Sequence, residues 1–326
     1  MNLGGFAGPQ GFRDMARKNH PIEILSRHGA PAANRSAHPV VSGRWLLVAL
    51  GVVIAAAVAC AWGALCLLFW QGAWQLLYRP TSAVTHTPAV AGLKYEPVEF
   101  AVTETGSTRL RGWWIPAAPK AGSARYTVLY LHGRVGNLGD SVNALAGIHA
   151  AGANVFAFDY RGYGQSEFVR PNEAHWRQDA DWALDYLTDT RQIGASSIVL
   201  AGSKLGANLA LEVAAAHPEL GGVVLDAPMN APLDLVFNDA RAHLVPARLL
   251  FHDRYGMQEP AAGLRIPSLW ILAAGVSAGA ANQPRVMAAY GAVTAPKVRA
   301  PAAGRGGLGS LRKWLAGLNS HRPVTD

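Results

Sequence analysis

The sequence predicts an α/β protein with a doubly wound, mostly parallel sheet, preceded by one transmembrane helix. Short, almost continuously apolar segments alternate with helical patterns over the C-terminal two thirds of the 326-residue chain. Such segments are typical of strands in a sheet that is covered by helices on both faces. An uncharged apolar run at residues 45–70 precedes this alternation and has no counterpart within it. Ligands bind this type of sheet at the carboxyl ends of its strands, so the loops there hold the candidate site.

The apolar run is long enough to cross a lipid bilayer. It has 26 residues, and at about 1.5 Å per residue a helix of this length exceeds the roughly 30 Å hydrocarbon core. Trp45 begins the run, and Trp70, Trp74 and Tyr78 follow its far end, which resembles the aromatic belts of membrane helices. A buried core helix is the alternative, but a helix this long without a polar face is unusual in a soluble domain. The run also exceeds the apolar part of a cleaved signal peptide. We therefore expect insertion into a bilayer.

The charges before the apolar run predict the membrane topology, and the position of the run divides the chain into expected segments. Residues 1–44 carry six basic and two acidic residues, so the positive-inside rule places the N-terminus in the cytoplasm of a single-pass cell-membrane protein. The C-terminal domain is then extracytoplasmic, and periplasmic in a Gram-negative bacterium. Residues 1–44 are expected to be a mostly disordered basic tail and 71–95 a linker. The globular domain is expected at 96–320, followed by a short tail at 321–326.

Composition narrows the partners and cofactors. The chain has a net charge of +8, and residues 260–326 carry eight basic residues against one acidic residue. No nucleic-acid-binding motif accompanies this basic region, so no nucleic-acid partner is expected. Both cysteines, Cys60 and Cys66, lie in the apolar run, which leaves the domain without a disulfide or a cysteine-based metal framework. No metal and no cofactor is expected, since the chain also lacks a metal-ligand cluster and a dinucleotide fingerprint.

The predicted elements follow one another in a regular order. Two segments around Thr105-Gly106-Ser107 form a hairpin, and five further strands come after it. One helix is expected at 172–191, where five apolar residues recur at helical spacing, and another follows residue 204, where Leu205, Leu209 and Val213 form a stripe. A final strand and helix are expected near "PKVRAP" and "GSLRKWLAGL". The seven earlier strands are "EPVEFAVTE", "LRGWWIP", "YTVLYLH", "NVFAFDY", "SIVLAG", "GVVLDAP" and "PSLWILAAG".

Four motifs occur in register along these elements: "LYLHGRVGN" after one strand, "FDYRGYGQS" after the next, "GSKLG" between a strand and a helix, and "LDAP". Together they resemble the α/β-hydrolase fold over about residues 75–320. The "GWWIP" strand and the N-terminal helix resemble its membrane-anchored, serine-aminopeptidase-like branch. The resemblance implies acyl transfer by a nucleophile at a G-x-S-x-G elbow, a histidine, an acid, and backbone donors for the oxyanion.

This chain departs from that pattern at three points, which indicates a degenerate triad. The elbow has Lys204 at its centre, while Ser203 lies one residue early and is the runner-up nucleophile. No acidic residue occurs between Glu259 and Asp326, and the loop expected to carry the histidine contains Arg305. The one histidine after His252, His321, follows the final helix.

In the predicted fold, Asp226 and the loop that contains His132 lie near the elbow. Asp226 is either a relocated acid or a turn residue. The oxyanion-side loop is formed by His132, Gly133 and Arg134, and its His132 is expected to be structural. No catalytic residue is therefore expected in the family's usual sense.

The sequence accordingly predicts a membrane-anchored, non-catalytic protein that binds a small molecule or another protein. One alternative is a residual serine hydrolase that cleaves ester, acyl or peptide bonds through Ser203, and another is a membrane scaffold subunit. A third alternative is Schiff-base chemistry at a desolvated Lys204. A sharper hypothesis has Arg134, Lys204 and Arg305 converging on an anion. Otherwise Arg134 and Arg305 face solvent and Lys204 pairs with a carboxylate.

Overall fold

The computed structural model describes residues 42–118, 125–272, 283–301 and 305–318, and for residues 305–309 it describes only the backbone. The chain forms two compact units, and the boundary between them follows Ala55, within the N-terminal helix. The predicted tail at 1–44 lies almost entirely outside the described residues.

Helix α1 (Gly43–Gly72) contains the whole of the predicted span 45–70. Among the described residues it is the one helix that is long and apolar enough to cross a membrane, with a mean hydropathy of 2.5 in its most apolar window. The segment that follows belongs to the core of the domain, because Ala73, Leu77 and Tyr78 are buried there. It forms the short helix α2 (Trp74–Leu77) and the short strand β1 (Arg79–Pro80).

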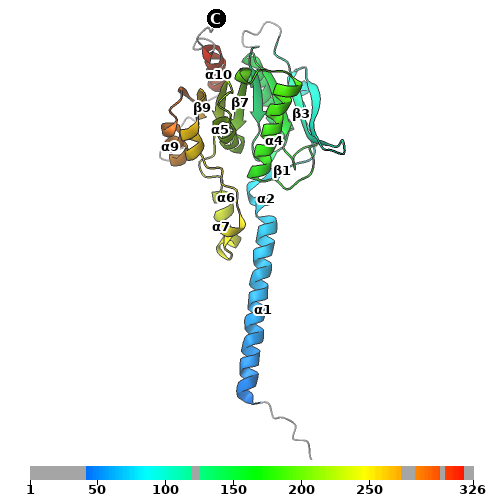
Figure 1. The fold of residues 1–326 in the computed structure, drawn as a ribbon, viewed down its shortest axis with the longest axis vertical. Coiled ribbons are helices and arrows are strands. Elements are labelled where there is room, and N and C mark those ends of the chain that lie inside the picture. Colours follow the sequence, from blue (N-terminus) through cyan, green and yellow to red (C-terminus); the bar gives the residue numbers. More distant parts are fainter. Residues whose placement is uncertain (1–41, 119–124, 273–282, 302–304, 319–326) are drawn as a thin grey trace, which may run out of the picture. The chain divides into compact units, whose positions relative to one another are not determined.

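The main sheet has eight strands in the order β10-β9-β8-β7-β4-β6-β3-β2 (Figure 1). Strand β3 runs antiparallel to both β2 and β6, and the remaining neighbours are parallel. This confirms the predicted doubly wound, mostly parallel sheet. The strands are β2 (Glu96–Val102), β3 (Thr108–Ile115), β4 (Thr127–Leu131), β6 (Asn154–Asp159), β7 (Ile198–Ser203), β8 (Gly222–Asp226), β9 (Ser268–Leu272) and β10 (Lys297–Pro301).

Helices cover both faces of this sheet. Apolar side chains alternate along each central strand, so that Leu129 and Leu200 join one buried cluster while Val128 and Val199 join the other. Helices α4 (Glu173–Asp185), α5 (Leu205–Ala216), α8 (Gln258–Gly263) and α9 (Pro284–Ala292) contribute to the first cluster, and α3 (Val142–Ala150) and α10 (Arg305–Leu318) to the second.

The helix predicted at 172–191 begins as α4 and continues as a wider turn over Tyr186–Thr190. The Asn172 side chain caps its first turn by accepting a hydrogen bond from the His175 N–H.

An insertion lies between β8 and α8 that the sequence patterns did not predict. It contains α6 (Asp234–Phe237), the short turn η5 (Ala240–His243) and α7 (Ala247–Leu250). These elements follow the carboxyl end of β8, the end of the sheet at which the elbow also lies (Figure 1). We refer to residues 229–251 as the insertion.

A second pair of strands links the loop after β4 to the chain that follows α1. Strand β5 (Val135–Gly136) runs parallel to β1, with Arg79 opposite Val135. The carboxyl end of β4 is therefore joined by main-chain hydrogen bonds to residues that come a few positions after the apolar helix.

Candidate active site

The elbow keeps the geometry of a strained strand-to-helix turn. Lys204 lies between the end of β7 and the start of α5 with φ 54° and ψ −117°, a backbone conformation that L-residues rarely adopt. The flanking glycines allow close packing: a Cβ on Gly202 would lie 2.1 Å from the Gly206 carbonyl oxygen, and one on Gly206 would lie 2.2 Å from that of Leu131. The turn thus presents the Lys204 side chain at the position where the fold presents a nucleophile.

Lys204 is exposed, and its main chain is fixed to the neighbouring strand. Its N–H donates to the Asp226 carbonyl at 2.9 Å. Its side chain passes the oxyanion-side loop, since a Cβ built on Gly133 would lie 3.6 Å from the Lys204 Cβ and 3.8 Å from its Cδ. Among the residues that the structure describes, the Lys204 ammonium has no ion pair within 4 Å.

Ser203 belongs to a different polar group from Lys204. In the register of β7 and β8 it lies opposite Asp226, and its Oγ donates to the Asp226 Oδ2 at 3.4 Å. Burial raises the pKa of Asp226, and the Ser203 hydrogen bond and the Lys204 charge oppose that rise. The Tyr130 hydroxyl also bonds to Ser203 and Ser141, and burial of this phenol raises its pKa. The hydrogen-bond partners of Ser203 are therefore a carboxyl group and a phenol.

The sequence patterns did not identify Tyr130 as part of the site. It lies within the apolar strand β4, where its alternation with Leu129 and Leu131 indicates only a buried side chain. In the parallel register Tyr130 pairs with Ala201. Ser203 lies two residues after Ala201 on the same strand, so Tyr130 and Ser203 share a face of the sheet. Register is a tertiary property, and strand composition alone does not define it.

His132 is enclosed within the loop that follows β4. Its side chain is 1% exposed, its Nδ1 donates to the Gly133 carbonyl at 2.8 Å, and its Nε2 lies 3.4 Å from the Asp159 Oδ1. The ring packs against Tyr160 and Tyr163 at centroid distances of 4.5 Å and 5.2 Å. The imidazole is thus surrounded by the loop and by aromatic rings, in an arrangement that fixes the loop.

Arg134 joins the oxyanion-side loop to the segment after α1. Its guanidinium Nη1 donates to the Leu77 carbonyl at 2.8 Å, and its own carbonyl accepts from the Arg79 N–H and the Tyr163 hydroxyl. Burial and the nearby Arg79 charge lower the pKa of Arg134. Arg305 is the first residue of α10, and its side chain lies outside the described residues. Convergence of Arg134, Lys204 and Arg305 on one anion therefore stays a prediction.

The loops expected to carry the acid and the histidine, at 273–282 and 302–304, lie outside the described residues, as does His321. The sequence itself has no Asp, Glu or His from residue 260 to residue 320. A histidine with two carboxylate neighbours does occur at His217, which contacts Asp181 and Glu219. It follows the last residue of α5, about 20 Å along the helix from Lys204 at 1.5 Å per residue, so it lies outside the site.

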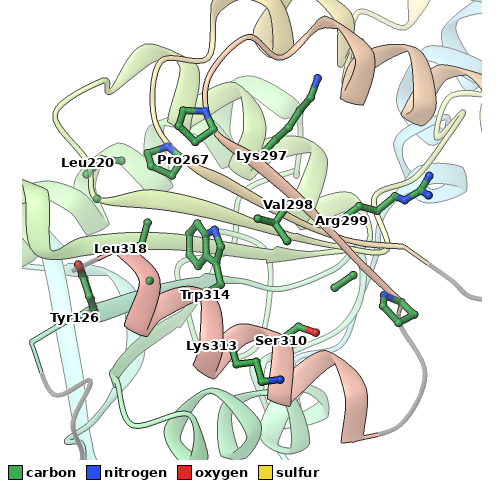
Figure 2. A pocket seen from close by; sticks show the side chains of 15 residues that line it. Tyr126, Leu220, Pro267, Lys297, Val298, Arg299, Ser310, Lys313, Trp314 and Leu318 are labelled. Atoms are coloured by element: carbon green, nitrogen blue, oxygen red, sulfur yellow. The ribbon is translucent and has the colours of Figure 1, made fainter. Parts of the chain in front are cut away.

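A cavity of about 1040 Å³ lies between β10 and α10 (Figure 2). Trp314 stands at its centre, and Lys313 and Arg299 lie at its rim. Tyr126, Gly221, Pro267 and Pro296, which directly precede β4, β8, β9 and β10, also line it. The cavity is therefore at the amino ends of the strands, opposite the elbow.

The eight-stranded sheet, the elbow and the loop after β4 define a protein of the α/β-hydrolase fold. An esterase from Pyrococcus furiosus aligns with a TM-score of 0.53 and 20% identity over 75% of this chain and 96% of the esterase. An α/β hydrolase from Vibrio vulnificus aligns with a TM-score of 0.53 and 18% identity over 75% of this chain and 88% of that protein. These likenesses concern the fold.

The sequence assigns the chain to one family within that fold. The profile of the family described as serine aminopeptidase, S33 matches residues 122–291, which is more than half of the chain, and the chain belongs to this family. The protein YfhR of Salmonella typhi is 34% identical over 123 residues, a match that covers 37% of this chain and 40% of the relative. The α/β hydrolase domain-containing protein 17C of Mus musculus is 31% identical over 134 residues, covering 41% of this chain and 40% of the relative. The chain thus spans less than half the length of these relatives.

Proposed function

We propose that this chain is a membrane-anchored member of the family that binds a ligand or a partner protein and does not catalyse hydrolysis. The observation that carries the proposal is the position of Lys204 at the strained elbow, where acyl transfer needs a hydroxyl. The turn keeps its geometry, so the lysine occupies the place of the nucleophile itself.

The surroundings of the elbow support the same conclusion. A serine hydroxyl is a weak nucleophile near neutral pH unless a base takes its proton. Ser203 bonds to Asp226 and Tyr130, and His132 is enclosed in its own loop. The segment from 260 to 320, which would supply the acid and histidine, contains neither. Loss of a triad removes several orders of magnitude of rate.

Membrane anchoring rests on α1. Its most apolar window combines a mean hydropathy of 2.5 with 6% burial, which favours lipid over a protein core as its surroundings. The basic residues before it favour a cytoplasmic N-terminus and an extracytoplasmic domain.

The exposed Lys204 ammonium next to the start of α5 suits an anionic ligand such as a carboxylate or phosphate. A partner protein with an acidic side chain at this position is the corresponding macromolecular ligand. A scaffold subunit, with the fold used only as an interaction surface, is a related possibility that pull-down from detergent extracts distinguishes.

A residual serine hydrolase is the second candidate, and the Ser203–Asp226 contact favours it. In that case Ser203 would react with an acyl group while Asp226, whose pKa burial raises, would take the proton. A carboxylate is a much weaker base than an imidazole, so this arrangement predicts slow turnover at best.

Labelling with a fluorophosphonate probe tests the proposal. The full chain in detergent is expected to show no labelling, in parallel with an active serine hydrolase as a positive control. Labelling that disappears in Ser203→Ala would establish the second candidate. Labelling that persists in Ser203→Ala would indicate another nucleophile and would also contradict the proposal.

A further inference from the structure

The insertion exposes two large apolar side chains. Leu244 and Leu249 are 60% and 75% exposed, while the nearby Ala242, Val245 and Ala247 are buried in the core. The short elements of the insertion are therefore anchored to the domain through small apolar residues and present larger ones outward. Scattered exposed leucines need no explanation in themselves, so the neighbours of this surface decide its role.

The neighbour of this surface is the apolar helix. The indole Nε1 of Trp62 donates to the Leu244 carbonyl at 3.1 Å, and both residues belong to the unit that begins at Ala56. Further along the helix, Phe69 is buried in the same cluster as Val245, and Leu65 and Cys66 pack against that cluster. The insertion therefore lies beside the helix at residue 62, ten positions before its end at Gly72.

The position of Trp62 limits the range of depths that this contact can have in a bilayer. About 20 helical residues cross the hydrocarbon core, and α1 runs from Gly43 to Gly72. Any 20-residue stretch within these limits starts between 43 and 53 and ends between 62 and 72, so each one contains Trp62. The Leu244 main chain then lies between the edge and the middle of the hydrocarbon core, about 15 Å along the helix from Gly72.

We propose that the insertion is a second membrane contact, with Leu244 and Leu249 embedded in the same bilayer leaflet that surrounds the C-terminal half of α1. The inference rests on the membrane anchoring proposed above. It adds that the acyl chains below the lipid headgroups cover the exposed leucines of the insertion. The exposed His243 and Arg248 beside these leucines can extend to the lipid headgroups, and other polar groups of this surface have partners. The indole of Trp62 satisfies the Leu244 carbonyl, as backbone groups at this depth require, and Arg241 pairs with Asp239.

The arrangement also explains which end of the sheet faces the membrane. The insertion leaves the carboxyl end of β8, and Arg134 at the carboxyl end of β4 donates to Leu77, directly after the helix. The carboxyl ends of the strands, where Lys204 lies, therefore face the bilayer. A ligand would reach the elbow from the membrane surface.

Single-cysteine labelling of the full chain tests this inference. In a background with Cys60→Ala and Cys66→Ala, an environment-sensitive fluorophore is attached at Leu249→Cys and the protein is reconstituted into phosphatidylcholine vesicles containing spin-labelled lipid as a quencher. Val298→Cys provides the matched control, because Val298 is 47% exposed near the start of β10, at the amino ends of the strands and away from the insertion. Val53→Cys, within α1, reports whether the helix itself is inserted.

We expect the Leu249 label to be quenched several-fold more strongly than the Val298 label, while the Val53 label is quenched by lipids spin-labelled deep in the acyl chain. Equal quenching at residues 249 and 298, with residue 53 quenched, would overturn the inference and leave the anchor intact. Absence of quenching at residue 53 would instead refute the anchor, and the inference with it. A blue-shifted but unquenched label at residue 249 would show that protein, such as a second copy of the chain, covers the insertion, which also overturns the inference.

Discussion

Replacement of Lys204 by glycine is expected to stabilise the protein. Lys204 has φ 54° and ψ −117°, a conformation that costs an L-residue about 1–3 kcal/mol and costs glycine little. Glycine also adds freedom to the unfolded chain, which lowers stability by about 0.4–1 kcal/mol. Because the Lys204 ammonium has no ion pair within 4 Å among the described residues, little binding energy is lost with the side chain.

The net gain is about 1 kcal/mol, which corresponds to a rise in Tm of roughly 2–4 °C for a domain of this size. Thermal unfolding of the full chain in detergent, followed by intrinsic tryptophan fluorescence, measures this shift. Lys204→Ala is the matched control, since it removes the ammonium but keeps the Cβ and its strain, and its free energy of unfolding is expected to stay within about 0.5 kcal/mol of that of the unmodified chain. A glycine variant no more stable than the alanine variant would refute the strained-elbow account.

Three further predictions concern the elements that hold the site. Gly206→Ala is expected to lower the free energy of unfolding by about 1–3 kcal/mol through overpacking, whereas Gly194→Ala, which meets no atom within 4 Å, is expected to be nearly neutral; equal effects in denaturant titration would contradict the packing argument. Asp179→Ala removes one partner of the buried ion pair with Arg161 and is expected to cost about 3–5 kcal/mol in the same titration; a loss below 1 kcal/mol would show that the pair is not needed. Burial raises the pKa of Asp253, so the folded state holds that proton more tightly than the unfolded chain. This contribution is complete below about pH 4 and is lost as pH rises through the folded-state pKa. The Tm of the unmodified chain relative to Asp253→Asn should therefore fall as pH rises above about 4, and a Tm difference that does not change with pH would refute this account of Asp253.

Local sequence signals predicted the sheet and the elbow because both depend on short-range chemistry. The strand "SIVLAG" and the glycines at 202 and 206 specify a strand followed by a tight turn, and the structure has β7 ending at Ser203 and α5 beginning at Leu205. The doubly wound, mostly parallel sheet follows from alternating strands and helices, which leave few alternative topologies. The apolar run 45–70 likewise forms one continuous helix.

Contacts between distant segments carried no comparable local signal. Arg134 follows a His-Gly pair at the expected oxyanion loop, which suggested a role toward a ligand, yet its guanidinium donates to the Leu77 carbonyl. The partner is 57 positions earlier in the chain. Every residue has a main-chain carbonyl, so the sequence does not show which one accepts this hydrogen bond. The insertion at 229–251 is built from elements of four residues, too short to show a periodic pattern. Its contact with Trp62 joins residues 182 positions apart.

The turnover of Lys204→Ser measures the central claim most directly, because it restores the nucleophile at the residue that the strained turn presents. If the acid and the histidine are also missing, kcat/KM for a short-chain p-nitrophenyl ester should stay within about tenfold of the unmodified chain, since serine without a base gains little. A rise of about a thousandfold or more would contradict the account, because it would require a functional base close to the elbow.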